Sequence, residues 1–148
     1  MKYTKTALRR ALLVPAVLVT LGMSATRASA QLYNPVAISS GQEMSDSLSP
    51  ADIPTGFGGF ARDYTVELQE GDQITIDVLS DEFDTLVSLM DSEGITVSEN
   101  DDGPDGTTNS LLFARITTGG KYTVRVRSYA GQGAGQFSLK VARLREIE

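Results

Sequence analysis

The sequence predicts an all-β protein, a single antiparallel β-sandwich of jelly-roll-like type with about eight strands. Most segments after residue 60 alternate apolar and polar residues with a period of two, which is typical of strands with one buried face. Turns rich in glycine and aspartate separate these segments, and the connections are too short for crossover helices, so we expect antiparallel pairing. No segment repeats its apolar residues with the period of 3.6 that a helix requires.

The alternation locates the strands individually. The first two segments after residue 60 flank the turn Glu70-Gly71-Asp72, and this arrangement predicts a hairpin with one face inward. Gly119-Gly120 and the run from Gly131 to Gly135 mark further turns. One short strand is predicted earlier, at Glu43–Leu48. The other seven are expected at 64–68, 73–78, 85–90, 95–98, 112–116, 121–127 and 136–141.

Residues 1–30 have the three parts of a secretory signal peptide. A basic start containing Arg9-Arg10 precedes the apolar stretch 11–21, and Ala28-Ser29-Ala30 places small residues where a signal peptidase cleaves. The apolar stretch is too short to span a membrane. We therefore expect export to the periplasm or the extracellular medium, by the general secretory route or, given the arginine pair, by the twin-arginine route.

The remainder of the chain is expected to form one domain. Residues 31–59 contain three prolines and a glycine-rich run, so we predict a loosely ordered segment with one short strand there. The sandwich core is predicted at 60–143, within a domain that begins near residue 41. A tail is predicted at 144–148.

Composition excludes several classes of function. Removing residues 1–30 takes away five of the 13 basic residues and none of the 19 acidic ones, so the net charge falls from −6 to −11. Such an acidic surface repels nucleic-acid phosphates and anionic lipid headgroups, so we expect no nucleic-acid partner and no stable membrane insertion after signal cleavage. Without histidine or cysteine, the usual catalytic triads, zinc sites and disulfides cannot form, and we predict that the chain is not an enzyme.

An acidic, glycine-containing loop is the best candidate for a site. Calcium binds six to eight oxygens from carboxylates, carbonyls and water, and this loop is dense in such groups. The helix-loop-helix calcium pattern is not met, because Leu112 stands where that pattern needs a glutamate. The competing interpretation is a solvated loop in which these residue types serve turn geometry. The candidate calcium ligands are Asp91, Asn100, Asp101, Asp102 and Asp105.

Three further features have ordinary structural interpretations. Asp84-Thr85 begins like an aspartic-protease motif, but Leu86 follows and only one copy exists, so we expect Asp84 to cap a turn. Arg125 and Arg127 face the same side of one strand, where they would pair with acidic residues across the sheet or, alternatively, hold an acidic partner. The aromatic residues near turns, which could cover the sandwich ends or stack on a partner, are Tyr33, Phe57, Phe60 and Tyr129.

A series of short motifs follows in a recognisable order. Phe83-Asp84-Thr85 and an apolar strand lead to the turn Asp91–Gly94, then to the acidic loop Glu99–Gly103, and later to Gly120–Val126 and Gly135–Leu139. Together they resemble the bacterial pre-peptidase C-terminal (PPC) domain. The resemblance implies a β-sandwich of the kind found mainly behind the catalytic domains of secreted peptidases, and calcium at one end of the sandwich, as in some related modules.

We therefore expect a secreted, non-catalytic β-sandwich that acts as a binding or interaction module, with calcium stabilisation where the acidic loop holds the ion. The expected partner is a secreted protein or a cell-surface polymer. One alternative is an accessory protein that assists the secretion or folding of a separately encoded peptidase. The third hypothesis is a small hydrolase.

Overall fold

The computed structural model describes residues 33–56 and 58–144, which lie in the compact unit Tyr33–Glu148. The predicted signal peptide at 1–30 and all but the first residue of the predicted tail at 144–148 lie outside the described residues. Within the described residues, no helix is long and apolar enough to cross a membrane.

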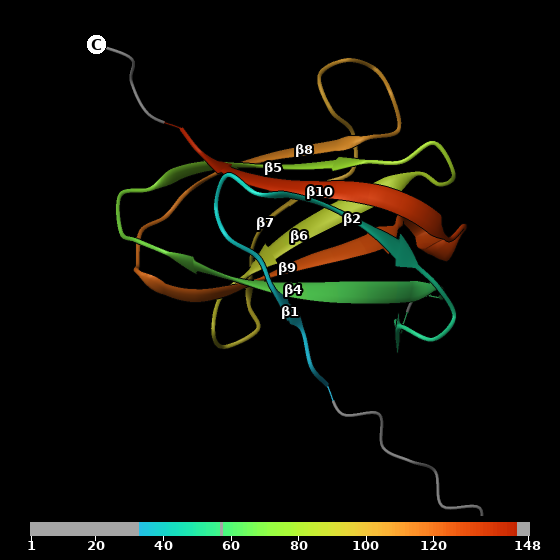
Figure 1. Cartoon of the computed structure of the whole chain (residues 1–148), viewed down its shortest axis with the longest axis horizontal. Coiled ribbons are helices and arrows are strands. Elements are labelled where there is room, and N and C mark those ends of the chain that lie inside the picture. The colour runs from blue at the N-terminus through green and yellow to red at the C-terminus, as the bar shows by residue number, and fades with distance from the viewer. Residues whose placement is uncertain (1–32, 57, 145–148) are drawn as a thin grey trace, which may run out of the picture. The chain divides into compact units, whose positions relative to one another are not determined.

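The strands form two sheets that pack face to face (Figure 1). The larger sheet has six strands in the order β1-β4-β9-β6-β7, with β3 also paired to β4, and the smaller has the order β2-β10-β5-β8. The strands are β1 (Val36–Ala37), β2 (Glu43–Leu48), β3 (Ile53–Pro54), β4 (Phe60–Leu68), β5 (Gln73–Leu79), β6 (Thr85–Met90), β7 (Thr96–Asn100), β8 (Ser110–Arg115), β9 (Gly120–Ser128) and β10 (Gly135–Arg143).

The predicted fold class is confirmed, because all pairings are antiparallel except the short parallel contact of β1 with β4. The eight predicted strands are all present, and the two additional ones, β1 and β3, each have two residues. A two-residue strand is too short to show an alternating pattern, so the sequence could not reveal either of them.

The predicted hairpin of residues 64–68 with 73–78 is wrong, since β4 and β5 lie in different sheets. The turn between them does not join two paired strands. Its main chain forms hydrogen bonds with Ile116, the residue after β8. Gly71 N donates to the carbonyl of Ile116 at 2.8 Å, and Ile116 N donates to the carbonyl of Asp72 at 2.8 Å. An inward apolar face suits a strand in a hairpin and a strand that crosses between sheets equally well, so the alternation does not distinguish them.

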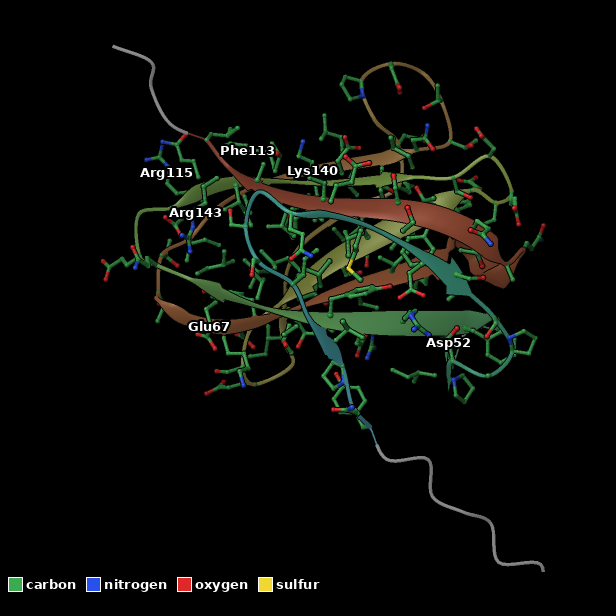
Figure 2. All side chains as sticks on the ribbon, in the orientation of Figure 1. Asp52, Glu67, Phe113, Arg115, Lys140 and Arg143 are labelled. Atoms are coloured by element: carbon green, nitrogen blue, oxygen red, sulfur yellow. The ribbon has the colours of Figure 1, made fainter. Side chains whose placement is uncertain are left out.

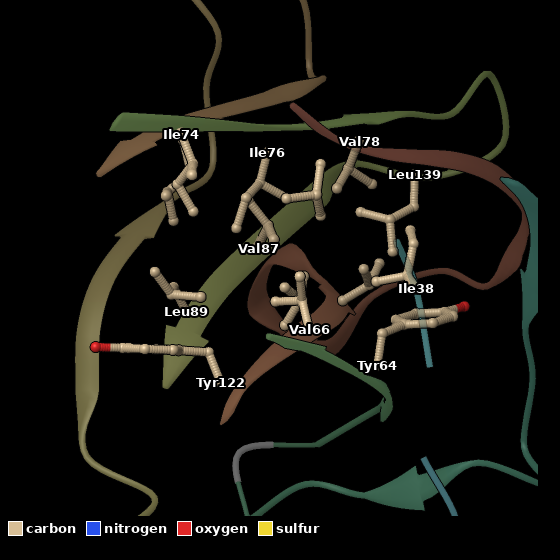
Figure 3. Close-up of a cluster of buried hydrophobic side chains, with 14 of the residues drawn as sticks. Ile38, Tyr64, Val66, Ile74, Ile76, Val78, Val87, Leu89, Tyr122 and Leu139 are labelled. Atoms are coloured by element: carbon tan, nitrogen blue, oxygen red, sulfur yellow. The ribbon is translucent and has the colours of Figure 1, made fainter. Parts of the chain in front are cut away.

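The core lies between the two sheets and consists of the inward-facing apolar residues of both (Figure 3). Ile76 and Leu139 of the smaller sheet face Val66 and Leu89 of the larger one, and all four are almost fully buried. Burying a side chain of this size contributes about 1.5–3 kcal/mol relative to leaving it exposed. Phe137 adds edge-to-face ring contacts, among them one with Tyr64 at a centroid distance of 6.3 Å.

One charged side chain, Arg62, faces inward between the sheets at the edge of the core. Its Nε lies 2.8 Å from Oδ2 of Asp46 on β2, and its Nη1 lies 2.6 Å from Oδ1 of Asp52. The hydroxyl of Tyr64 donates to the same Asp46 oxygen at 2.9 Å. Because β2 and β4 belong to different sheets, this network links the sheets, and it neutralises a charge that would otherwise be costly to desolvate.

The fully buried Leu139 provides a test of the core. Leu139→Ala is expected to lower the free energy of unfolding by about 2–5 kcal/mol, because it removes buried methyl groups and leaves a cavity. Leu144→Ala, at a position 48% exposed, is the matched control and should change stability by less than about 0.5 kcal/mol. Urea unfolding curves measure both, and similar costs at the two positions would contradict the described core.

Candidate binding surface

The loop end of the sandwich is formed by the loops 80–84, 101–109 and 129–134. Hydrogen bonds join these loops to each other and to the start of β10. Ser80 N donates to Oδ1 of Asn109 at 2.9 Å, and Ser80 Oγ donates to the carbonyl of Gln136 at 2.7 Å. Gln136 N donates to Oε2 of Glu82 at 3.1 Å. Gly135 permits this contact, because a Cβ there would lie 2.0 Å from that Glu82 oxygen.

The five predicted calcium ligands do not come together. Asp91 lies in the turn between β6 and β7, at the end of that hairpin opposite the loop end, where its Oδ1 accepts hydrogen bonds from Glu93 N and Ile95 N at 2.9 Å. The hairpin strand β7 has five residues, so about 15 Å separates Asp91 from the loop end. Asp91 therefore serves the turn.

Of the other four predicted ligands, Asn100 ends β7 and three lie in the loop that follows it, and three of the four have hydrogen bonds within this loop or to β8. Asn100 Oδ1 accepts from Leu111 N at 2.9 Å, and the carbonyl of Asp101 accepts from the hydroxyl of Ser110 at 3.3 Å. Asp105 Oδ1 accepts from the hydroxyl of Thr107 at 2.8 Å and from its N–H at 3.2 Å. Across the described residues, no three acidic side chains lie close enough to hold a metal ion.

Asp84 is the unusual carboxylate of the loop end. Its Oδ1 is buried without a hydrogen-bond partner, so this atom does not cap a turn as the sequence suggested. Its main chain is satisfied instead, with the carbonyl accepting from Tyr129 N at 2.8 Å. Burial raises the pKa of Asp84, and the nearby negative charges of Asp102 and Asp101 raise it further. The structure thus brings two of the predicted ligands near a carboxylate that the sequence assigned to turn geometry.

Beside the loop end, a groove of about 410 Å³ lies on the outer side of the smaller sheet. Leu79, 43% exposed, supplies an apolar surface. Asp81 and Glu82, both exposed, bring two carboxylates, and the remaining polar groups are hydroxyls and amides. The lining residues are Ser45, Leu79, Ser80, Asp81, Glu82, Asn109, Gln136, Phe137 and Ser138. Sequence reasoning missed this groove because its residues come from β2, β5, two loops and β10.

The outer face of the larger sheet carries the two arginines singled out in the sequence, and both pair across strands. Arg125 forms a two-pronged ion pair with the buried Asp63, with both N–O distances 2.8 Å, and these hydrogen bonds raise the pKa of Arg125. Arg127 lies 3.3 Å from Glu99. The expectation of cross-strand pairing is therefore confirmed. Both guanidinium groups are engaged in ion pairs within the chain, which argues against a role in binding an acidic partner.

The turn aromatics have different roles. Tyr33 donates its hydroxyl to Asp63 at 2.7 Å, although its side chain remains 61% exposed. Phe60 packs against the core and is partly buried. Tyr129, 48% exposed, lies at the loop end, in the single 3-10 turn of the described residues. Phe57 lies outside the described residues.

The fold and its loops define the class of protein: an antiparallel two-sheet β-sandwich that presents a groove beside one cluster of loops. Residues 61–128 match the family model of the bacterial pre-peptidase C-terminal domain. This part of the chain is therefore similar to the PPC domain, and the resemblance noted in the sequence is confirmed.

Two solved structures show the same fold. The pre-peptidase C-terminal domain of collagenase from Bacillus anthracis aligns with a TM-score of 0.54 and 18% identity, over 73% of this chain and 94% of that one. PliG from Aeromonas hydrophila, a periplasmic lysozyme inhibitor of g-type lysozyme, aligns with a TM-score of 0.52 and 15% identity, over 75% of this chain and 100% of that one. Comparison with curated proteins gave no match.

The carboxyls of Asp84 and Asp105 lie in neighbouring loops. Removing the charge of each is expected to change the stability of the fold in opposite directions. The ionised form of Asp84 is disfavoured in the folded state, so ionisation of this carboxyl lowers the stability of the fold. This loss of stability is absent below the ordinary pKa of 3.8 and fully present above the raised pKa of the folded state. Hydrogen bonds from Thr107 lower the pKa of Asp105, so its ionisation favours folding above the ordinary value.

In a buffer with chelator at about pH 7, Asp84→Asn is therefore expected to raise Tm and Asp105→Asn to lower it, although both remove one negative charge. At about pH 3, where both carboxyls are protonated in the unfolded chain, the difference between the two variants should shrink. Thermal unfolding followed by circular dichroism measures this. Changes in Tm of the same sign in both variants would mean that the net charge of the chain, and not the surroundings of each carboxyl, determines the effect on stability.

Proposed function

We propose that the chain is an exported, non-catalytic module that binds a basic protein through the groove beside the loop end. The groove carries this proposal, because it sets the carboxylates of Asp81 and Glu82 beside the exposed side chain of Leu79. A lysine or arginine side chain matches that combination, since its aliphatic stem packs on an apolar residue while its charged head meets carboxylates.

The charge of the whole chain supports a basic partner. The net charge is −6, and it becomes −11 for residues 31–148 once the predicted signal peptide is removed. Such a field attracts cationic partners over long distances and repels anionic ones, which speeds encounter with a basic surface. The absence of histidine and cysteine from the sequence supports a non-catalytic role.

The similar folds support a module that acts outside the cytoplasm. PliG is named a periplasmic inhibitor of g-type lysozyme, so its sandwich acts on another protein. The collagenase domain belongs to a peptidase. At 15% and 18% identity these likenesses extend to the fold, and the partner of this chain is inferred from its own groove and charge.

The groove is tested by neutralising its carboxylates. Asp81→Asn/Glu82→Gln is expected to weaken binding to a g-type lysozyme or to the cationic probe poly-L-lysine at least about tenfold, which corresponds to 1.4 kcal/mol. The substituted amides keep the side-chain size and an acceptor for Gln136 N. Surface plasmon resonance with the immobilised protein gives the dissociation constants.

The matched control, Glu70→Gln/Glu93→Gln, makes the same change of charge in two exposed turns at the opposite end of the sandwich. It should alter binding by no more than about twofold. Equal losses in both variants would assign the effect to net charge and contradict a groove site. Binding to neither probe, with retention on collagen or an insoluble polysaccharide instead, would replace the basic protein with a polymer. Turnover of a peptide or glycoside substrate would contradict the non-catalytic role.

We propose calcium stabilisation of the loop end as a second candidate function, because Oδ1 of Asp84 is buried without a partner beside the charges of Asp101 and Asp102. A divalent cation would satisfy that oxygen and offset the mutual repulsion of the three carboxylates. As the described side chains lie, no three acidic groups could hold a metal, so binding would draw Asp101 and Asp102 toward Asp84.

Calcium is expected to raise Tm by several degrees relative to chelator, since a ligand of the folded state adds about 2.7 kcal/mol at a hundredfold excess over Kd. Asp101→Asn/Asp102→Asn should abolish the rise, whereas Asp91→Asn, in the distant turn, should leave it intact. Differential scanning calorimetry with calcium, magnesium and chelator measures these effects. An unchanged Tm in calcium would remove this second function and leave the groove proposal untouched.

A further inference from the structure

Strand β8 forms one edge of the smaller sheet. It pairs with β5 on one side, and among the described strands none pairs with it on the other. Its outward row is largely apolar, with Leu111 37% exposed and Phe113 54% exposed, and it ends in the exposed Arg115. Figure 2 labels Phe113 and Arg115 near each other at the end of this strand. An apolar edge strand with open hydrogen-bonding groups invites pairing with another strand.

The free part of this edge can be located from the hydrogen bonds at both ends of β8. Leu111 N is occupied, because it donates to Oδ1 of Asn100 at 2.9 Å, on the side away from β5. Main-chain N–H groups alternate in direction along a strand, so those of Phe113 and Arg115 also point away from β5. The open segment is therefore short and centred on Ala114.

We propose that this segment pairs with the same segment of a second copy of the chain, antiparallel, about a two-fold axis at Ala114. Phe113 then lies opposite Arg115 of the second copy, and Arg115 lies opposite its Phe113. Each of these two pairs exchanges two main-chain hydrogen bonds through the groups that point away from β5. The pairing joins two four-stranded sheets into one continuous sheet.

The side chains make β8 complementary to itself. A guanidinium next to an aromatic ring is attracted by the ring face, and the two-fold axis creates this pair twice. Within the described residues, Arg115 makes no ion pair, in contrast to Arg62, Arg125, Arg127 and Arg143. A foreign strand would need an aromatic residue and a cation in the same order and spacing, whereas a second copy supplies both.

The other long edges are less suited to this pairing. β7 carries the charged Glu99, and its register with β6 shifts at Leu89/Met90. β2 begins with the exposed Glu43 and carries Asp46. Charges and irregularities of this kind protect edge strands from pairing, and β8 has neither before Arg115. The contact is small and joins two negatively charged chains, so we expect a weak dimer with a Kd on the order of 0.1 mM.

Sedimentation equilibrium of the purified chain at about 0.15 M salt tests the proposal, because this ionic strength screens long-range repulsion to about 8 Å. Phe113→Thr and Arg115→Thr are each expected to raise the dimer Kd at least about fivefold, since each removes both cation–π pairs. Threonine keeps β-propensity, so folding is preserved, and thermal unfolding verifies this. The control Val97→Thr changes an exposed apolar residue of β7 and should leave the Kd within about twofold.

Amide hydrogen exchange followed by NMR identifies the contact itself. The N–H groups of Phe113 and Arg115 should exchange more slowly as the concentration rises from about 10 µM to about 1 mM, in step with the dimer fraction. The N–H of Val97 should not respond. A chain that remains monomeric at about 1 mM overturns the proposal, and so does a dimer that keeps its Kd in both β8 variants. Either result is independent of binding at the groove, which lies near the other end of β8.

Discussion

The fold depends on the packing of two apolar sheet faces, because each sheet shields the apolar face of the other from water. Neither sheet could exist alone, because each would expose a row of residues such as Ile76 or Val87 that are now fully buried. The same constraint explains the arrangement around Arg62. A guanidinium that enters the gap between the sheets is tolerated because Asp46 and Asp52 meet it there, and in doing so it fixes how β2 and β4 face each other.

Much of this architecture was accessible from the alternation of residue types. Where one face of a strand meets the core and the other meets water, the period of two is unmistakable, as in β9, whose residues Tyr122, Val124 and Val126 are all buried. The alternation also places the arginines between them on the outward face of β9, where pairing with acidic residues of neighbouring strands could be expected. Strand partners were harder, because alternation gives the facing of a strand and not its neighbours, and β4 and β5 were therefore wrongly joined as a hairpin.

The site was less predictable than the fold because it is assembled from distant segments. The sequence highlighted a dense run of acidic residues, yet the structure uses Asp91 for a turn and Asp105 to hold its own loop. The groove depends instead on contacts such as Ser80 with Asn109, and on the space that Gly135 leaves for Glu82. Nothing in the local pattern around any one of these residues indicates the others, since their proximity is a product of tertiary packing.

The place of β10 between β2 and β5 has a consequence for the order of folding. These partners lie far apart in sequence: Gly135 pairs with Leu48, and Arg143 pairs with Ile74. The smaller sheet therefore cannot form completely until β10 has been synthesised, because β10 joins β2 to β5. A domain with so many long-range pairings is expected to fold slowly for its size.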